Sequence, residues 1–246
     1  MNETRAVVLA AGQGTRMKSD LPKVLVPVCG RPMIDYVVEM LAAAGIERSI
    51  VVVGYRSDLV REHLARRSGL DFAEQTERKG TGHAVMMCRE ALAGFQGQVL
   101  IVTGDSPLVS SESVGKLLAE QRRGGYACLL GTAHKANPTG LGRIVRDATG
   151  AFVGIVEEKD ATPEQRKITE VNMSCYVFDC GALLRSLDQL RADNAQKEYY
   201  LTDCPGILRA AGDKVEASAV LTPKETLSIN TVEELAIVEA ALKGNC

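Results

Sequence analysis

Apolar and polar positions form two alternating patterns through the first half of the chain. Short continuous apolar runs, rich in valine and leucine, are separated by longer segments whose apolar residues recur at helical spacing. The first pattern is typical of strands buried on both faces, and the second of amphipathic helices. The expected strands are residues 5–10, 49–55, 70–75, 98–105 and 126–133. The expected helices are residues 33–45, 57–69, 81–94 and 110–125.

This alternation predicts an α/β fold with a mainly parallel sheet. Apolar strands that alternate with helices form parallel sheets covered by helices on both faces. The carboxyl ends of such strands lie at one edge of the sheet, and ligands bind there. We therefore expect Gln75, Asp105 and the loop around Gly12 to line one crevice.

The pattern changes after about residue 140. Residues 142–160 are predicted to form two strands around a turn that contains Asp147 and Gly150, and residues 170–179 a further strand. These segments predict a smaller β-rich lobe laid against the main sheet, within one domain of residues 1–246. The expected helices of this half are residues 181–190, 205–212 and 229–242. The last helix has a possible capping box and a packing stripe, formed by Thr231 with Glu234 and by Val232, Leu235, Val238 and Leu242.

Composition and charge mainly exclude classes of protein and partner. The 246 residues carry a net charge of −2, which does not favour nucleic acid or an anionic membrane as a partner. No apolar run approaches the roughly 20 residues that span a bilayer, and the start does not resemble a signal peptide. The seven cysteines form no C-x-x-C pair, which favours free thiols in a reducing compartment. We expect a cytoplasmic protein.

The most informative stretch is "VVLAAGQGTRMKSDLPKVL", residues 7–25. A strand leads into Gly12 and Gly14, whose backbone N–H groups can approach phosphate oxygens closely. Arg16 adds a planar phosphate-binding fork and Lys23 a mobile point charge. The stretch lacks the third glycine of a dinucleotide-binding fingerprint and the G-K-[ST] end of a P-loop. It therefore predicts a polyphosphate ligand of another kind.

The same stretch resembles the signature of the sugar-1-phosphate nucleotidylyltransferases. Three later stretches, "GTGHA" (80–84), "EEKDAT" (157–162) and "NAQKEYYLTD" (194–203), resemble the pyrophosphorylase domain of bacterial N-acetylglucosamine-1-phosphate uridylyltransferases. The resemblance extends over nearly the whole chain. It implies a Rossmann-like fold with a smaller sugar-binding lobe. It also implies Mg²⁺-dependent transfer of UMP from UTP to N-acetylglucosamine 1-phosphate, giving UDP-N-acetylglucosamine and pyrophosphate.

The resemblance also assigns roles to residues. Nucleotide binding falls to Leu9, Ala10, Ala11, Gly12, Gly14, Gln75, Gly80 and Thr81, the last three at uracil. Sugar binding falls to Gly142, Glu157 and Asn172, with Tyr199 and Thr202 at the border of the pocket. Arg16 and Lys23 are the catalytic residues that it implies, and Asp105 and Asn230 the metal ligands. About residues 1–134 would then bind the nucleotide and about 135–225 the sugar, while about 226–246 supply the metal-ligand loop and last helix.

The residue chemistry agrees with these roles. Mg²⁺ takes oxygen ligands, often only one or two of them from the protein, and Asp105 and Asn230 can supply such oxygens. A sugar phosphate is already anionic, so the reaction needs charge neutralisation and in-line positioning rather than a general base. We accordingly expect His83 to be a packed structural residue.

An α/β domain that binds some other phosphate ligand is one alternative, and two further alternatives remain open. The same chemistry could act on another sugar 1-phosphate or nucleotide, because Met173 and Ser174 stand where the family tends to have Thr-Gly beside the sugar. A non-catalytic regulator that binds a nucleotide sugar is the other alternative. The bacterial enzymes usually continue into a β-helix built of hexapeptide repeats. This sequence contains no such repeats, so we expect neither acetyltransferase activity nor β-helix trimerisation and make no prediction of oligomeric state.

Overall fold

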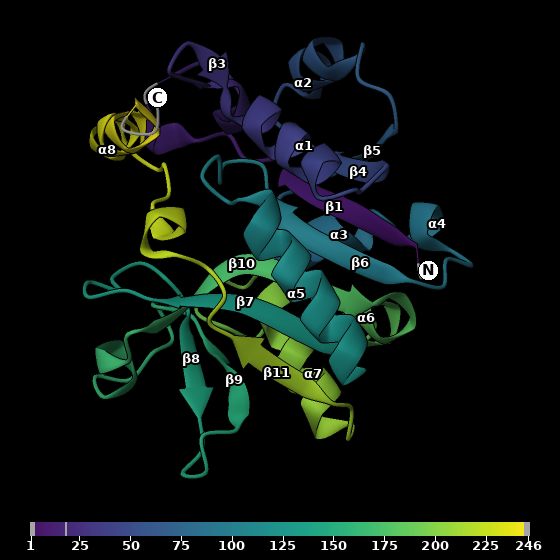
Figure 1. The fold of residues 1–246 in the computed structure, drawn as a ribbon, viewed down its shortest axis with the longest axis vertical. Helices are drawn as coiled ribbons and strands as arrows, with labels where there is room; N and C mark the ends of the chain where they lie inside the picture. Colours follow the sequence, from purple (N-terminus) through teal and green to yellow (C-terminus); the bar gives the residue numbers. More distant parts are fainter. Residues whose placement is uncertain (1–2, 18, 244–246) are drawn as a thin grey trace.

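One mixed sheet forms the centre of the molecule (Figure 1). The computed structural model describes residues 3–17 and 19–243. From edge to edge the strands are β11 (Val215–Ser218), β7 (Cys128–His134), β10 (Glu170–Asp179), β6 (Gln98–Thr103), β1 (Thr4–Ala10), β4 (Arg48–Val53) and β5 (Leu70–Glu74). A hairpin of β8 (Arg143–Arg146) and β9 (Phe152–Val156) joins this sheet through β10, and β2 (Pro27–Val28) pairs with β3 (Arg31–Pro32) separately.

The strand directions confirm the predicted fold class, with one difference. Strands β6, β1, β4 and β5 are parallel, and so are β7 and β11, but β10 runs antiparallel between β6 and β7. We assigned residues 170–179 to the smaller lobe, and this placement is wrong. Val177 and Phe178 are both fully buried on opposite faces of this strand, as expected inside a sheet that helices cover on both sides.

The helices cover both faces of the sheet, as predicted. One face packs against α1 (Met33–Ala43), α2 (Ser57–Leu64) and α5 (Ser111–Gly124). The other face packs against α3 (Thr81–Met86), α4 (Arg89–Leu92), α6 (Cys180–Leu187) and α7 (Cys204–Ala210). Neighbouring strand residues divide between the two cores, because side chains alternate across a sheet. The last helix, α8 (Val232–Lys243), instead packs beside the β2–β3 hairpin (Figure 1).

Three details of the predicted helices need correction. Residues 81–94 form α3 and α4 instead of one helix, with a break at Cys88. The helix expected over 57–69 ends at Leu64, the last residue of this segment that is buried, and residues 65–69 are all exposed. Val232 was expected in the packing stripe of the last helix, yet it is 50% exposed on the first turn. Leu235, Val238 and Leu242 do contact the core of the hairpin.

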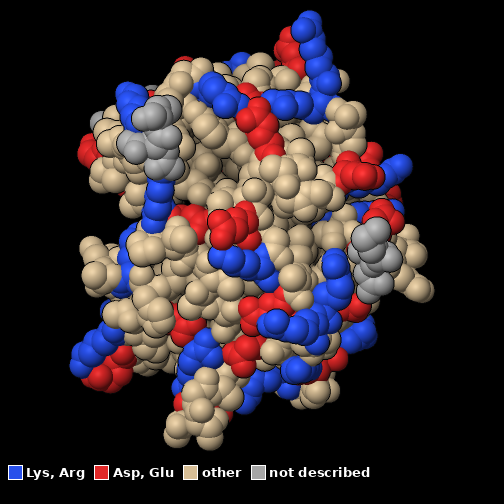
Figure 2. All heavy atoms as spheres, in the orientation of Figure 1, with Lys and Arg blue, Asp and Glu red and all other residues tan. Residues whose placement is uncertain are grey.

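The surface agrees with the composition. Figure 2 shows both signs of charge interspersed over the visible face, without a large area of one sign. Within residues 3–17 and 19–243, no helix is long and apolar enough to cross a membrane. The six cysteines of the described part are free thiols, while Cys246 lies outside the described residues.

The strand order places a crevice at the carboxyl end of β1. The chain steps from β1 to β4 and β5 on one side, and then returns to β6 on the other side of β1. Where the strand order reverses in this way, the loops after the two neighbouring strands turn to opposite faces of the sheet. This leaves a crevice between them, and ligands bind there. The loop after β1 contains Gly12, and the loop after β6 begins with Gly104 and Asp105. The predicted site therefore starts at the reversal of strand order.

Candidate functional site

The loop after β1 folds back onto Lys23. Gly14 has a φ of +67°, and a Cβ atom at this position would lie 2.8 Å from the Cβ of Lys23. Only glycine allows this approach without strain. The backbone N–H of Lys23 also donates to the carbonyl of Gly12 at 3.3 Å. A Cβ at Gly12 would meet no atom within 4 Å, so the loop is packed on the Lys23 side and open at Gly12.

The four residues predicted for catalysis and metal binding meet at one point. The Lys23 ammonium contacts the carboxylate of Asp105 and donates to Oδ1 of Asn230 at 2.8 Å. The Arg16 guanidinium donates to the same oxygen at 3.3 Å. Only 13% of the Lys23 side chain and 24% of the Asp105 side chain are exposed, so the ion pair is largely shielded from water.

Asn230 is held by the start of α8. Its backbone N–H donates to the Glu234 carboxylate at 2.6 Å, and its side-chain amide donates to Ser228 at 3.1 Å. The Thr231 hydroxyl accepts the backbone N–H of Glu234 at 3.2 Å, as predicted for a capping box. The Glu234 carboxylate, however, reaches one residue further back than predicted, to Asn230. These bonds leave Oδ1 of Asn230 to face the two cationic side chains.

The same atoms form a donor set that suits a hard divalent cation. Asp105 and Asn230 each direct an oxygen at one position, where the Lys23 ammonium now supplies the positive charge. Mg²⁺ prefers oxygen ligands and often takes only one or two from a protein, the remainder coming from water and phosphate. The residues present therefore fit a metal that is bound together with a phosphate ligand.

A second loop, after β5, contains the residues predicted for uracil. The Gln75 side chain is buried, and its Nε2 lies 3.0 Å from the carbonyl of Gly80 and 3.1 Å from Nδ1 of His83. His83 thus has the structural position expected for it. Oε1 of Gln75 makes no hydrogen bond to a residue that the structure describes. This acceptor remains free for a ligand.

The residues around Tyr199 support this loop. Gly80 has a φ of +101°, and a Cβ there would lie 2.5 Å from the carbonyl oxygen of Tyr199. The Tyr199 backbone accepts from Gly82 at 2.8 Å and donates to Lys79 at 2.8 Å. Its ring stacks near His83, with centroids 6.4 Å apart. Tyr199, predicted to border the sugar pocket, makes these contacts with the loop after β5 and the start of α3. Nearby, the Thr81 hydroxyl accepts the N–H of Leu201 at 3.1 Å.

The residues predicted for the sugar also lie together. The Thr202 hydroxyl donates to Oε1 of Glu157 at 3.0 Å, and the N–H of Asn172 donates to the carbonyl of Gly142 at 2.9 Å. A Cβ at Gly142 would lie 3.6 Å from Oε1 of Glu157, so glycine keeps this space narrow but open. Burial raises the pKa of Glu157, and the Thr202 hydrogen bond opposes this rise.

Tyr200 is a candidate that sequence reasoning missed. Its hydroxyl is buried and has no hydrogen-bond partner within residues 3–17 and 19–243. Burial, and then the negative charges of Asp160 and Glu157, raise the pKa of Tyr200 to about 12. A buried hydroxyl without a partner costs free energy unless a ligand supplies one. The pair of adjacent tyrosines was the available signal, but sequence alone does not say which ring faces the pocket.

A bulge in β10 lies beside these residues. The register of β10 against β7 shifts between Asn172 and Cys175, and Ser174 has a φ of +53°. This left-handed conformation favours glycine, the residue that the related family tends to have here. The N–H of Ser174 donates to the side-chain oxygen of Asn172 at 3.2 Å. The bulge therefore fixes the Asn172 amide.

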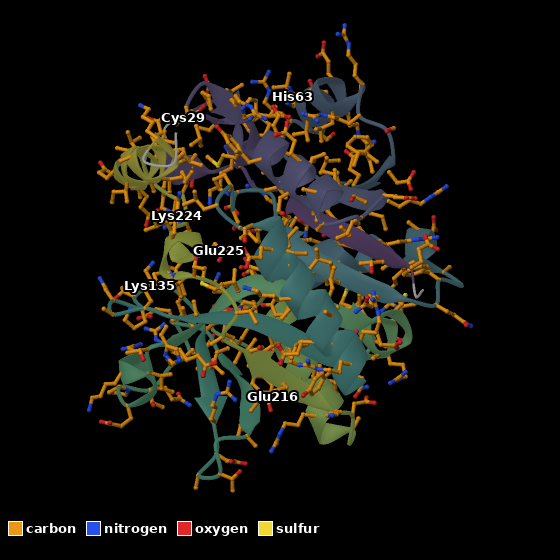
Figure 3. All side chains as sticks on the ribbon, viewed as in Figure 1. Cys29, His63, Lys135, Glu216, Lys224 and Glu225 are labelled. Carbon is orange, nitrogen blue, oxygen red and sulfur yellow. The ribbon has the colours of Figure 1, made fainter. Side chains whose placement is uncertain are left out.

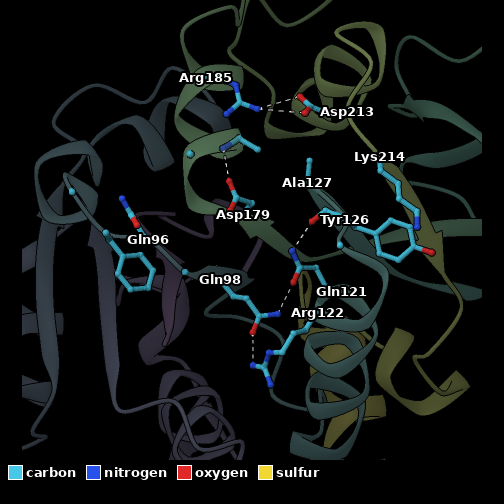
Figure 4. Close-up of a pocket in the computed structure, with 16 residues that line it drawn as sticks. Gln96, Gln98, Gln121, Arg122, Tyr126, Ala127, Asp179, Arg185, Asp213 and Lys214 are labelled. Carbon is cyan, nitrogen blue, oxygen red and sulfur yellow. Dashed lines mark hydrogen bonds and ion pairs between the residues drawn. The ribbon is translucent and has the colours of Figure 1, made fainter. Parts of the chain in front are cut away.

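A cavity of about 810 Å³ lies at the opposite edge of the sheet, next to the start of β6 and the end of β10 (Figure 4). Its wall contains Gln98 and Gln121, whose side chains bond to each other at 2.6 Å, and Gln121 donates to the carbonyl of Tyr126 at 2.5 Å. None of the predicted site residues lines it. The cavity is therefore separate from the site at the carboxyl ends of the strands.

Comparison with known proteins agrees with this arrangement. Residues 6–200 match the family described as MobA-like NTP transferase domain. The chain is 45% identical over 239 residues to the bifunctional protein GlmU of Pelotomaculum thermopropionicum, covering 97% of this chain and 52% of the relative. It is 42% identical over 243 residues to GlmU of Halalkalibacterium halodurans, covering 99% and 53%. The chain thus spans about half the length of these curated relatives.

The fold has a counterpart among solved structures. A UDP-glucose pyrophosphorylase complexed with UDP-glucose superposes with a TM-score of 0.81 at 18% identity, covering 99% of this chain and 100% of that one. At this identity the likeness concerns the fold alone. The family match and the GlmU matches confirm the resemblance that the glycine-rich stretch and the three later stretches predicted.

Proposed function

Since this chain belongs to the family of MobA-like NTP transferase domains, we propose that it transfers UMP from UTP to N-acetylglucosamine 1-phosphate, releasing pyrophosphate. One observation carries the proposal: Arg16, Lys23, Asp105 and Asn230 gather at the carboxyl end of β1 and β6. A protein that only binds a nucleotide sugar has no need of this full charge set. UTP and sugar phosphates are cytoplasmic compounds, so we assign the reaction to the cytoplasm.

The loop after β5 supports uracil as the base. Both hydrogen bonds of the Gln75 amide to described residues use its nitrogen, which leaves Oε1 as an acceptor. Uracil presents a donor at its N3–H, whereas the same position of cytosine is an acceptor. A fixed Gln75 oxygen would therefore discriminate UTP from CTP. Gly80, whose carbonyl accepts from the Gln75 amide, and the following Thr81 would complete the base contacts.

The charge cluster supports phosphoryl transfer. An oxygen of the sugar phosphate forms a bond to the α-phosphorus of UTP while the bond to pyrophosphate breaks. Arg16 and Lys23 neutralise negative charge on the phosphates and on the departing pyrophosphate. Nucleotidyltransferases of this family generally use a divalent metal. We propose Mg²⁺, held by Asp105 and Asn230, which when bound supplies further charge neutralisation.

The sugar is proposed to bind at the second group of residues. Glu157 and Asn172 offer acceptors and a donor to sugar hydroxyls, and the glycine backbone at Gly142 would let an acyl substituent approach closely. Thr202 holds the Glu157 carboxylate, and the buried hydroxyl of Tyr200 is a donor without a partner among the described residues. The bulge at Ser174 gives this pocket a shape that a different acceptor sugar could also use.

A pyrophosphate-release assay with Mg²⁺ tests the proposal. UTP, dTTP, CTP, GTP and ATP are each combined with N-acetylglucosamine, glucose and mannose 1-phosphates. We expect turnover with UTP and N-acetylglucosamine 1-phosphate. Turnover with a different pair would keep the chemistry and change the substrate. A folded protein that binds UTP but turns over no pair would overturn the proposal and favour the regulator.

Two variants test the assigned roles in the same assay. Asp105→Asn should abolish metal-dependent turnover, whereas Asp71→Asn, on the exposed surface of β5, should not change it. Lys23→Ala should lower kcat by roughly a hundredfold, as for other preorganised charge contacts. Near-normal activity of Asp105→Asn would refute its role as a metal ligand.

A further inference from the structure

The Lys23 ammonium lies at the position where the two proposed metal ligands converge. It contacts the Asp105 carboxylate and, at 2.8 Å, Oδ1 of Asn230. Within residues 3–17 and 19–243, this is the only ion pair of Asp105. A cation that belongs to the chain therefore satisfies the oxygens assigned above to a divalent metal.

The backbone of Lys23 has little freedom, while its side chain can move. The N–H of Lys23 is bonded to Gly12, and Gly14 packs against its Cβ. Pro22, immediately before it, restricts the approach of the chain. The flexible four-carbon stem is thus the part that can take the ammonium to another partner. The open space at Gly12, next to this stem, is where a phosphate ligand could approach.

The Lys23 ammonium and a divalent cation would compete for the Asp105 carboxylate at this point. Like charges a few ångströms apart repel strongly where water is largely excluded, and the Lys23–Asp105 pair is mostly buried. Asp105 should therefore bind a divalent cation more tightly once Lys23 has left it.

We propose that Lys23 closes the metal site in the substrate-free protein and opens it by transferring its ammonium to a phosphate of the nucleotide. The inference rests on the proposed function, because the triphosphate is the new partner of Lys23. It adds an order to that function: the metal binds weakly alone, and the nucleotide raises its affinity by removing Lys23. Lys23 thereby has a positioning role before any chemistry.

Metal binding without nucleotide tests this role independently of turnover. The probe is Mn²⁺ alone, with free ion measured by electron paramagnetic resonance. Lys23→Met keeps the stem and removes the ammonium, so the affinity for Mn²⁺ should rise about tenfold or more, the scale of one charge-assisted hydrogen bond. Arg16→Met is the matched control, since it removes a cation from the same Asn230 oxygen but not from Asp105.

The outcomes separate this inference from the proposed function. The inference is supported if the affinity for Mn²⁺ rises clearly in Lys23→Met and changes little in Arg16→Met, provided that Asp105→Asn abolishes Mn²⁺ binding. An unchanged affinity in Lys23→Met, an equal rise in both variants, or Mn²⁺ binding that survives Asp105→Asn overturns it. Unfolding curves check that each variant is folded. A wild-type protein that does not bind UTP would overturn the proposed function, whatever Mn²⁺ binding shows.

Discussion

Glu225 connects the start of α5 with the segment that precedes Asn230. It lies in the short helix η5 (Pro223–Thr226), facing the start of α5, and its side chain is buried (Figure 3). Oε1 accepts the N–H of Ser110 at 2.8 Å and the Ser110 hydroxyl at 2.8 Å. Oε2 accepts the N–H of Thr222 at 2.6 Å and the hydroxyl of Ser113 at 3.0 Å. The carboxylate thus anchors the segment that leads to Asn230.

Replacing Glu225 by glutamine should destabilise the protein although the shape is conserved. Each carboxylate oxygen accepts one backbone N–H, from Ser110 or from Thr222. Whichever oxygen becomes an amide nitrogen, one of these N–H groups then faces a donor and cannot rotate away. A buried unsatisfied group costs about 1–3 kcal/mol, and the remaining bonds lose their charge assistance. We expect Glu225→Gln to lower the free energy of unfolding by about 2–4 kcal/mol.

Urea and thermal unfolding followed by circular dichroism measure this loss. In a chain of this size, the midpoint should fall by about 2–4 °C per kcal/mol. Glu112→Gln is the matched control, because Glu112 is exposed on α5 and forms a surface ion pair with Lys116. Its change should stay within about 0.5 kcal/mol. A loss for Glu225→Gln no larger than that of the control would refute the reasoning from fixed N–H donors.

The same carboxylate gives a pH dependence with a defined sign. Burial alone would raise the pKa of Glu225, but hydrogen bonds from Thr222 and Ser110 outweigh it and hold the pKa below the usual 4.5. The ionised form therefore stabilises the fold at neutral pH. This contribution declines as the pH falls below 4.5 and is lost below the folded-state pKa. The difference in the free energy of unfolding between wild type and Glu225→Gln should become smaller over that pH range.

Three further predictions concern the loops and the sugar side. Gly12→Ala should keep the midpoint of unfolding, because its Cβ would meet no atom, but it should weaken UTP binding measured by calorimetry. Gly80→Ala should lower the midpoint, because its Cβ would meet the Tyr199 carbonyl. Equal midpoints of the two variants would contradict this. Ser174→Gly should raise the unfolding free energy by about 1 kcal/mol by relieving a left-handed backbone, and Ser174→Ala should not. The pKa of Asp203 is raised to about 6 from 3.8, first by burial and then by the negative charges of Glu157, Asp193 and Asp160. As the pH rises, the unfolded chain therefore releases this proton before the folded protein does. The free energy of unfolding should fall between these two pH values. Asp203→Asn should remove this fall in a series of melting curves, and an unchanged slope would argue against it.

Sequence reasoning succeeded where residue type and position in a pattern were sufficient. The apolar runs located the parallel strands, and residues directly after such strands must share one edge of the sheet. This brought Asp105 and Gln75 to the same side as the Gly12 loop. Asn230, far along the chain, could be added only through the resemblance, because no local pattern links it to β1. The functional roles of these residues stay predictions for the assays above.

Other features depend on contacts that no local pattern records. The antiparallel insertion of β10 is a pairing choice, and its apolar run fits either a lobe or a central strand. Tyr199 and Tyr200 are identical in type, and only the irregular backbone between them decides which ring lies against His83 and which hydroxyl is buried. The break between α3 and α4 occurs at Cys88, a residue that packs as well in a helix as outside one.

The antiparallel β10 also sets an order in which the molecule can be completed during synthesis. Strands β6 and β7 do not pair with each other, since each pairs with β10. Until the ribosome has made residues 170–179, β7 has no partner on the side toward β6, and β11 comes later still. The nascent chain up to β7 therefore presents an open, apolar strand edge that can pair wrongly. Slow translation just before residue 170 would prolong this exposure, and rapid delivery of β10 would protect the chain from aggregation.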